Sequence, residues 1–393
     1  MKIGIGVSAE RDPASGAARA AAEASRSLAG EPADLVLLFA SGDHLLEPEP
    51  LLAAVRAELS PAALAGCGAG GVLGDGRELE SGTAVAVWAA SVDRGVARAW
   101  HLRSGPDDGS FTASTESEPP SDGVPPLPTG ATLVLLSDPY TFPTDALLDH
   151  LAVSAPGVPV LGGLSSGRTA GGSAALFIGD EVRGDGAVAV VLDGIETLPC
   201  VSQGAAPMGP EMTITAAEGN VIHELAGRPA LSAIEYAVAQ LPVDERSLVA
   251  AGLLIGIVID AGRPEYEQGD FLVRGVLGAD PQTGSVAVGT QVSAGQIIRL
   301  HARDARSADD DLRRSLRLHA TALGDQPPAG ALVFSCNGRG RGMFGIPDHD
   351  ASAVSRELSG APAAGFFAAG EIGPVGGRSF LHGFTATVAV FPA

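Results

Sequence analysis

Asp-Leu-Val-Leu-Leu-Phe-Ala-Ser, residues 34–41, is the first of three similar segments that decide how this chain is organised. Its continuous apolar run is typical of a buried strand. Thr-Leu-Val-Leu-Leu-Ser-Asp at 132–138 and Ala-Leu-Val-Phe-Ser-Cys at 331–336 have the same character. The three segments therefore open three copies of one repeated unit.

Each copy continues with the same succession of patterns. Helical patterns cover residues 51–59, 145–152 and 350–358. Glycine clusters follow at residues 66–71, 161–167 and 365–373. Alternating apolar runs close the copies at residues 83–88, 187–192 and 385–391. In the third copy, Asp348 or Asp350 is expected to cap the helix.

The repeated unit reads strand–helix–strand–strand. One such unit cannot bury both faces of its strands, so the copies must share sheets. The predicted fold class is α/β (α+β), with β-sheets built from the repeated units and helices packed on the outer faces.

Segments outside the copies have other patterns. Residues 104–130 are rich in Pro, Gly, Ser, Asp and Glu and are expected to form an exposed loop or disordered insertion. Residues 220–236 carry a helical pattern, and 303–320 predict a charged amphipathic helix. Antiparallel strands are predicted at 253–260, 271–277 and 285–288.

Length and composition narrow the class of protein. A chain of 393 residues exceeds what one core usually serves, so two domains are expected. The formal charge of −21 disfavours nucleic acid and anionic membrane surfaces as partners. The sequence begins without a signal-peptide pattern and has no apolar run of about 18 residues. Three scattered cysteines form no CxxC pair, and a cytoplasmic location is expected.

Several motifs resemble those of the FIST family. The N-terminal part is similar to the FIST-N module at residues 34–44, 66–74, 132–138 and 159–166. The stretches 202–209 and 221–230 resemble the family's boundary signature. The C-terminal part resembles the FIST-C module at residues 271–274, 334–340, 365–372, 381–382 and 385. The resemblance implies a FIST-N module at 1–200, with its exposed loop at 104–130, and a FIST-C module at 201–393.

The resemblance also implies a function. FIST proteins are sensory and bind small ligands, in bacteria often beside kinase, cyclase or methyl-accepting domains. Only Pro392 and Ala393 follow Phe391 here, and no kinase or nucleotide motif is present. Output is therefore expected through a separate signalling kinase or other protein, and a homo-oligomer is a further candidate assembly. The competing interpretation is an interaction platform without a free ligand.

The candidate site lies mainly in the C-terminal module. Glycines after a strand let a ligand approach backbone N–H groups, and arginine forks bind carboxylate or phosphate. Glu371 is suited to a ligand ammonium group, so an amino acid or small carboxylate is expected. The predicted binding residues are Arg274, Cys336, Asn337, Gly338, Arg339, Gly340, Arg341, Gly370, Glu371, Ile372 and His382. The alternative is a structural ion pair between Arg339 and Glu371.

Catalysis and cofactors receive less support. Arginines near Cys336 favour its thiolate, and His382 is a candidate base, but no third group completes a catalytic set. The alternative is a buried, inert cysteine. No cofactor or metal is predicted, because Asp138 and Asp185 have no partner at ligand spacing. Haem is kept as an alternative, since one branch of the family is associated with haem and nitric oxide sensing. Its axial candidates are His44, His223 and His382.

Overall fold

The computed structural model describes residues 1–105, 109–116, 118–324 and 326–393. The chain divides into two compact units. Unit 1 comprises Met1–Val201, Leu312–Leu381 and Thr385–Ala393, and unit 2 comprises Ser202–Asp311 and His382–Phe384. The first boundary falls at the expected junction near residue 200. The last part of the chain nevertheless belongs to unit 1, so the compact units differ from a simple division into 1–200 and 201–393.

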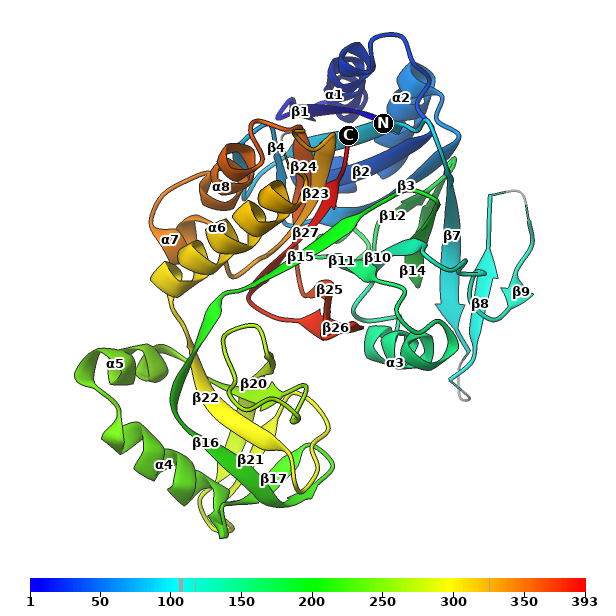
Figure 1. Ribbon diagram of the computed structural model, residues 1–393. Helices are drawn as coiled ribbons and strands as arrows, with labels where there is room; N and C mark the ends of the chain where they lie inside the picture. Colours follow the sequence, from blue (N-terminus) through cyan, green and yellow to red (C-terminus); the bar gives the residue numbers. More distant parts are fainter. Residues whose placement is uncertain (106–108, 117, 325) are drawn as a thin grey trace. The chain divides into compact units, whose positions relative to one another are not determined.

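Unit 1 contains the three predicted copies (Figure 1). Repeat one has β1 (Lys2–Ser8), α1 (Pro13–Leu28), β2 (Leu35–Ser41), the 3₁₀ turn η1 (Gly42–Leu45), α2 (Pro48–Leu59), β3 (Ala63–Ala69), β4 (Val72–Gly74), β5 (Arg77–Leu79) and β6 (Ala84–Ser91). Repeat two has β7 (Val96–Ser104), β8 (Phe111–Ser114), β9 (Ser121–Asp122), β10 (Thr132–Ser137), α3 (Thr144–Ser154), β11 (Val160–Leu164), β12 (Leu176–Ile178), β13 (Glu181–Arg183) and β14 (Ala187–Asp193). Repeat three has β15 (Leu198–Gln203), α6 (Ala305–Ala322), β23 (Gly330–Cys336), α7 (Arg341–Phe344), α8 (His349–Glu357), β24 (Ala363–Ala368), β25 (Glu371–Val375), β26 (Arg378–His382) and β27 (Thr385–Phe391).

The strand pairing is the same in all three repeats. The first buried strand pairs in parallel with the strand after the helix: β2 with β3, β10 with β11, and β23 with β24. It pairs antiparallel with the last strand of its repeat: β6, β14 and β27 respectively. The predicted fold class is therefore confirmed.

In all three repeats the two parallel strands approach each other closely, and this approach explains one glycine in each cluster. A Cβ atom on Gly66, Gly162 or Gly365 would lie 2.0, 1.9 or 1.7 Å from a backbone oxygen of the first strand. Such distances are impossible for real atoms, so these positions admit only glycine. These three glycines serve strand packing rather than the approach of a ligand.

The hairpin after each glycine cluster joins the sheet of another repeat. β4–β5 pairs with β24, β12–β13 with β3, and β25–β26 with β11. Ser166 also links all three repeats, because its Oγ accepts a hydrogen bond from Gly70 N (2.8 Å) and donates one to Phe367 O (2.5 Å). This cyclic exchange is how the copies share sheets, and it places repeat-one residues beside the end of β23.

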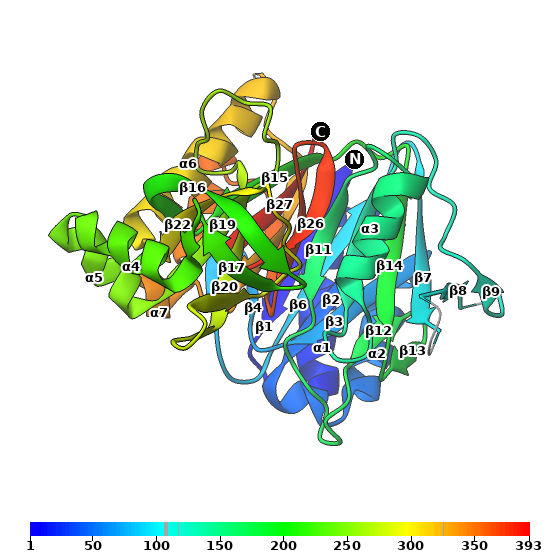
Figure 2. The ribbon, with the colours of Figure 1, turned by 90° about the horizontal axis from the view of Figure 1, so that it is seen from below.

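The inner faces of the three sheets form one apolar core. The ring centroids of Phe39 and Phe366 are 5.0 Å apart, and those of Trp88 and Phe391 are 5.2 Å apart. Helices cover the outer faces: α1 and α2 pack on the sheet of repeat one, α3 on that of repeat two, and α6 and α8 on that of repeat three. Figure 2 shows α3 lying over β11 and β14.

Unit 2 is built from the strands between β15 and α6. Its elements are β16 (Ala205–Glu218), β17 (Val221–Leu225), β18 (Arg228–Pro229), α4 (Ala230–Gln240), α5 (Val243–Ala251), β19 (Leu253–Val258), β20 (Phe271–Asp280), β21 (Ser285–Val288) and β22 (Ile297–Arg303). The strand order is β16-β22-β19-β20-β21-β17-β18, and β16 also pairs with β17, so the sheet closes on itself. The antiparallel strands predicted from the sequence are confirmed.

Three expectations about local structure were wrong in part. The expected loop 104–130 contains strand β8, whose Phe111 and Ala113 are buried; residues 106–108 and 117 lie outside the described part. In the expected helix 220–236, residues 221–225 form a strand, because Gly227 at φ 74° turns the chain before α4 begins. Asp348 occupies the N-cap of α8 without a capping side-chain bond, whereas Asp350 lies inside the helix.

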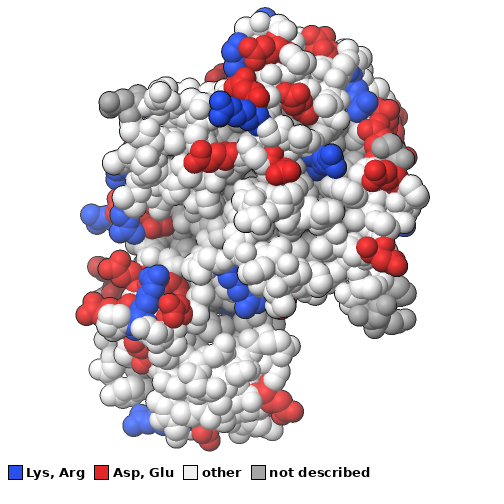
Figure 3. Space-filling model, turned by 45° about the vertical axis from the view of Figure 1, so that its right-hand side comes forward, with Lys and Arg blue, Asp and Glu red and all other residues white. Residues whose placement is uncertain are grey.

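Two surface properties bear on partners. On the face shown in Figure 3, acidic and basic side chains are interspersed between broad uncharged areas. Within the described ranges, no helix combines the length and apolar character that crossing a membrane requires.

Candidate functional site

A cluster of buried polar side chains lies where β23 ends and the chain turns toward α8. Arg339 is only 2% exposed, and two nitrogens of its guanidinium donate hydrogen bonds to the carboxylate of Asp350. The Nε–Oδ2 distance is 2.7 Å and the Nη2–Oδ1 distance is 2.9 Å. Ser335 Oγ donates to Asp350 Oδ2 at 2.7 Å, and His349 Nδ1 lies 2.9 Å from Oδ1. Both carboxylate oxygens of Asp350 are thus hydrogen-bonded twice.

The electrostatics of this pair follow from burial and proximity. Burial opposes the charged form of Asp350, but the Arg339 charge and the hydrogen bonds of the cluster hold its pKa well below its usual value. Burial likewise opposes the charge of Arg339, and Asp350 overcomes that effect, so the pKa of Arg339 is raised. Both Arg339 and Asp350 are therefore charged. Arg339 thus pairs with Asp350 and not with Glu371, the partner that the alternative interpretation gave it.

Glu371 is the second buried acid of the cluster. Its Oε2 accepts hydrogen bonds from Thr385 N (3.0 Å) and Thr385 Oγ1 (2.8 Å). Burial raises the pKa of Glu371 to about 8, although the bonds from Thr385, the nearby Cys336 thiol and the charge of Arg339 oppose the shift. The carboxyl group is therefore largely protonated at neutral pH.

Besides Glu78 Oε2 on the neighbouring β4–β5 hairpin, two atoms of the cluster lack a hydrogen-bond partner among the described residues: Arg339 Nη1 and Glu371 Oε1. Both side chains are fully buried. An unsatisfied buried polar group costs about 1–3 kcal/mol, and more when it is charged. Such groups in a native fold point to an internal water or to a ligand that completes them.

Repeat one supplies two further acids to this region through the β4–β5 hairpin and the residue after it. Glu80 Oε1 accepts a hydrogen bond from the backbone N–H of Arg341 at 2.8 Å, and Glu78 Oε1 accepts one from Ala351 at 3.0 Å. Burial raises the pKa of Glu78 to about 7, and the charges of Asp350 and Glu80 add to the shift. Sequence reasoning missed both acids, since about 260 residues separate them from Arg341 and Ala351. Their closeness to a glycine cluster was the only available signal.

The cluster has a glycine-rich cover. After Cys336, residues 337–348 contain four glycines and the short helix α7. The Phe344 ring stacks on His349 with centroids 3.4 Å apart, and the Arg339 guanidinium lies 5.1 Å from the same ring. Phe344 therefore lies against both His349 and Arg339.

The structure places the predicted site residues in four groups. Cys336, Arg339 and Glu371 lie together; Cys336 is 8% exposed, and its Sγ accepts a hydrogen bond from Gly338 N at 3.4 Å. Asn337, Gly338, Gly340 and Arg341 belong to the cover, with Asn337 and Arg341 exposed. Gly370 and Ile372 belong to sheet packing, as Gly370 O accepts from Leu164 N and Ile372 is in the apolar core over α3. Arg274 and His382 belong to unit 2, where Arg274 Nη1 donates to Val273 O at 3.1 Å.

Repeat two carries a different ion pair at the corresponding strand end. Asp138, directly after β10, is buried and pairs with Arg168 at 2.5 Å. Thr141 Oγ1 donates to its other oxygen at 2.6 Å. The sequence interpretation considered Asp138 only as a metal ligand, and its ion-pair partner Arg168 comes 30 residues later, after the glycine cluster.

The haem and metal alternatives can be compared with the same geometry. His44 Nε2 lies 2.8 Å from Glu10 O, and His223 Nδ1 lies 2.9 Å from Ser285 Oγ. Two of the three candidate axial ligands, His44 and His223, thus have a protein partner on one ring nitrogen. Within the described part of the chain, no three His, Cys, Asp or Glu side chains are arranged to hold a metal ion.

Known families and proteins match this chain over its length. The family model of the FIST N domain matches residues 34–228, and that of the FIST C domain matches residues 230–374. A Mycobacterium tuberculosis protein named Uncharacterized protein Rv0628c is 44% identical over 394 residues, covering 100% of both chains. A Mycobacterium bovis protein named Uncharacterized protein Mb0898c is 43% identical over 392 residues, covering 100% of this chain and 99% of the relative.

Proposed function

Because the chain belongs to the FIST family, whose domains are associated with sensory signal transduction and small-ligand binding, we propose that it is a small-molecule sensor. We assign its ligand to the buried polar cluster of repeat three. The ligand class that fits this cluster is an amino acid or a small carboxylate.

The observation that carries this proposal is the pair of unsatisfied atoms, Arg339 Nη1 and Glu371 Oε1. A ligand oxygen would complete the guanidinium, which already holds Asp350 with its other two nitrogens. A ligand ammonium group would complete Glu371 Oε1 with the carboxyl in its charged form, which the positive charge of the ammonium favours. A carboxylate provides the first group, and the ammonium of an amino acid provides the second.

Access to this site requires the cover to move. Residues 337–348 contain Gly338, Gly340, Gly342 and Gly345, and two of these have φ values near +70°. The contact of Phe344 with His349 and the hydrogen bond from Arg341 N to Glu80 hold the cover closed. Opening of residues 340–346 alone would break these two interactions and the contact of Phe344 with Arg339, while Arg339 keeps its bonds to Asp350.

The proposal is tested by titrating the purified protein with amino acids and small carboxylates and measuring its thermal unfolding. A ligand at one hundred times its Kd stabilises a protein by about 2.7 kcal/mol. Glu371→Gln preserves the size of the side chain and an acceptor for Thr385, so it tests recognition with little change in packing. Glu58→Gln, on the exposed end of α2, is the matched control.

We expect one ligand class to stabilise the wild type and Glu58→Gln but to lose at least a tenfold affinity in Glu371→Gln. Equal affinity in all three proteins would remove the cluster as the site. Arg339→Ala is a poor test, since it would leave Asp350 buried and unpaired.

Location and output are parts of the same proposal. Cys67, Cys200 and Cys336 are buried thiols that form no disulfide among the described residues, and this supports the proposal of a reducing, cytoplasmic compartment. The signal would then pass to a separate protein such as a kinase. A homo-oligomer remains a second proposed assembly, and light scattering would test it directly.

A further inference from the structure

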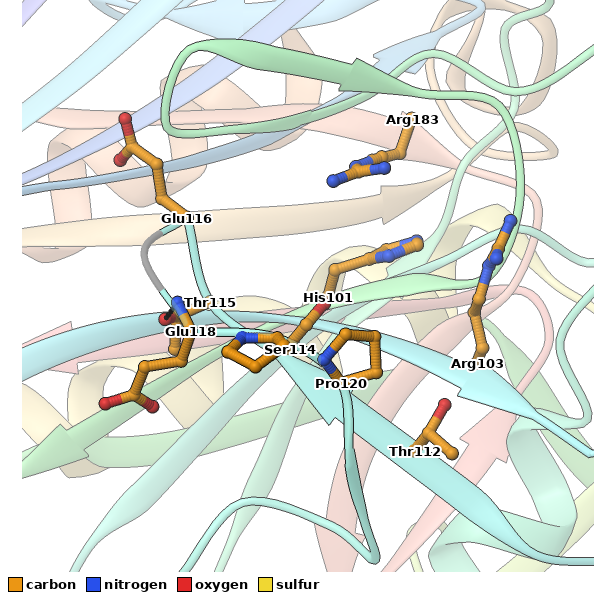
Figure 4. A pocket seen from close by; sticks show the side chains of 10 residues that line it. His101, Arg103, Thr112, Ser114, Thr115, Glu116, Glu118, Pro120 and Arg183 are labelled. Atoms are coloured by element: carbon orange, nitrogen blue, oxygen red, sulfur yellow. Dashed lines mark hydrogen bonds between the residues drawn. The ribbon is translucent and has the colours of Figure 1, made fainter.

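A second candidate binding site lies in repeat two, away from the polar cluster. A pocket of about 350 Å³ is lined by residues of β7, β8, β13 and the segment after β8 (Figure 4). This volume is at the lower end of the range found for small-molecule sites, about 300–1,000 Å³. No residue of the polar cluster lines it.

Positively and negatively charged side chains lie on opposite sides of the pocket. Figure 4 shows Arg103 and Arg183 on one side, Glu116 and Glu118 on the other, and His101 between them. Arg183 Nε is enclosed without a hydrogen-bond partner in the described chain. Glu116 is in a long ion pair with Arg56, at 3.8 Å, and its side chain is 44% exposed. A ligand with a negative group at one end and a positive group at the other matches this arrangement.

The arginines remain available to a ligand. Arg103 pairs with Asp185 at 2.6 Å, but the two side chains are 59% and 40% exposed. Arg183 pairs with Glu181, and these side chains are 41% and 51% exposed. Exposed pairs contribute only about 0–1 kcal/mol, so a ligand carboxylate can displace or join them at low cost.

The middle of the pocket is polar but uncharged. Thr112 and Ser114 contribute hydroxyl groups to the lining. His101 Nε2–H donates to Asp185 O at 2.8 Å, which leaves Nδ1 as an acceptor. Burial lowers the pKa of His101, and the charges of Arg183 and Arg103 lower it further, so the ring stays neutral. Hydroxyl donors and an imidazole acceptor match the C=O and N–H of a peptide group.

The pocket has room for more than a free amino acid. At about 30 Å³ per water, the volume corresponds to roughly twelve water-sized groups. Alanine has about six non-hydrogen atoms and the dipeptide Ala-Ala about eleven, by the same order-of-magnitude comparison. We propose that this pocket binds short peptides with free amino and carboxyl ends, as a site separate from the ligand site of repeat three.

The test uses Ala-Ala as the probe, with isothermal titration calorimetry on the full chain at pH 7 and low salt. We expect saturable binding of one Ala-Ala per chain. N-acetyl-Ala-Ala lacks the ammonium group and Ala-Ala-amide lacks the carboxylate, so each should bind at least tenfold more weakly. Free alanine should also bind at least tenfold more weakly. Absence of saturable Ala-Ala binding, or equal binding of a blocked peptide, overturns the proposal.

Variants then assign the binding to this pocket. Arg183→Gln and Glu118→Gln should each weaken Ala-Ala binding at least tenfold, while Arg94→Gln, on an exposed turn elsewhere in unit 1, should not. Glu371→Gln should leave Ala-Ala binding unchanged. If Glu371→Gln abolishes binding while Arg183→Gln and Glu118→Gln retain it, the peptide occupies the repeat-three cluster; the pocket is then rejected and the proposed function is retained.

Discussion

Replacement of Arg339 by methionine would expose how strongly the fold depends on the buried ion pair at the end of β23. The substitution removes two charge-assisted hydrogen bonds, of 2.7 and 2.9 Å, from a carboxylate that is fully buried. Asp350 would keep only Ser335 and His349 as partners. Breaking such a pair on one side costs about 3–5 kcal/mol, because an uncompensated charge stays in the interior.

The free energy of unfolding in urea, followed by the fluorescence of the buried Trp88, measures this cost. Arg378→Met is the matched control, because Arg378 pairs with Asp149 at 2.6 Å while the side chains are 48% and 70% exposed. That variant should lose about 0–1 kcal/mol. The double variant Arg339→Met/Asp350→Leu should recover at least half of the loss, since an apolar replacement of both partners removes the buried charge.

The pH dependence provides an independent check. In the wild type the pKa of Asp350 is depressed, so its stabilising effect is present above its usual value near 3.8 and is lost as the pH falls through the lower folded value. Without Arg339, burial should raise that pKa, and the deficit of the variant should shrink as the pH falls. A loss below about 1 kcal/mol in Arg339→Met, or a double variant no better than the single one, would refute the account of a buried, mutually dependent pair.

Three other outcomes are expected. Burial raises the pKa of Glu371 to about 8 from its ordinary value of 4.5, so wild-type stability should fall as the pH rises between these values. Urea unfolding of Glu371→Gln should show a smaller slope, with Glu78 still contributing, and identical slopes would contradict the shift. Gly365→Ala would place a Cβ 1.7 Å from a backbone oxygen and should prevent folding or cost more than about 3 kcal/mol, whereas Gly342→Ala, with open space, should be near neutral by circular dichroism melting. In native protein, Ellman's reagent should react slowly, with Cys336 (8% exposed) ahead of Cys67 (0%); the reverse order would show that the region around β23 is packed more tightly than described.

Much of the repeat architecture could be predicted because its signals are local. A buried strand needs a continuous apolar run, as at residues 35–41, and the close approach of parallel strands demands glycine, as at Gly162. The strands of unit 2 were also predictable from alternation and turns. The helix expected from residue 220 failed for the same local reason, since period-two and helical patterns overlap over so short a span.

The partners of the cluster were less predictable. Asp350 was expected to cap a helix, and its pairing with Arg339 depends on how α8 docks on the sheet. Glu78 and Glu80 reach the region only because the β4–β5 hairpin pairs with β24 of another repeat. Nothing in the local sequence records a pairing between strands about 290 residues apart.

By itself, the sequence determined the repeated unit, the family and the segment that bears the cluster, since each depends on residues close together in the chain. Only the tertiary structure decided which acid neutralises Arg339, which atoms stay unsatisfied, and which hairpin completes which sheet. The physical reason is that burial and charge pairing act between side chains in space. The same glycine, arginine and glutamate residues would have other hydrogen-bond and charge partners if each hairpin joined a different sheet.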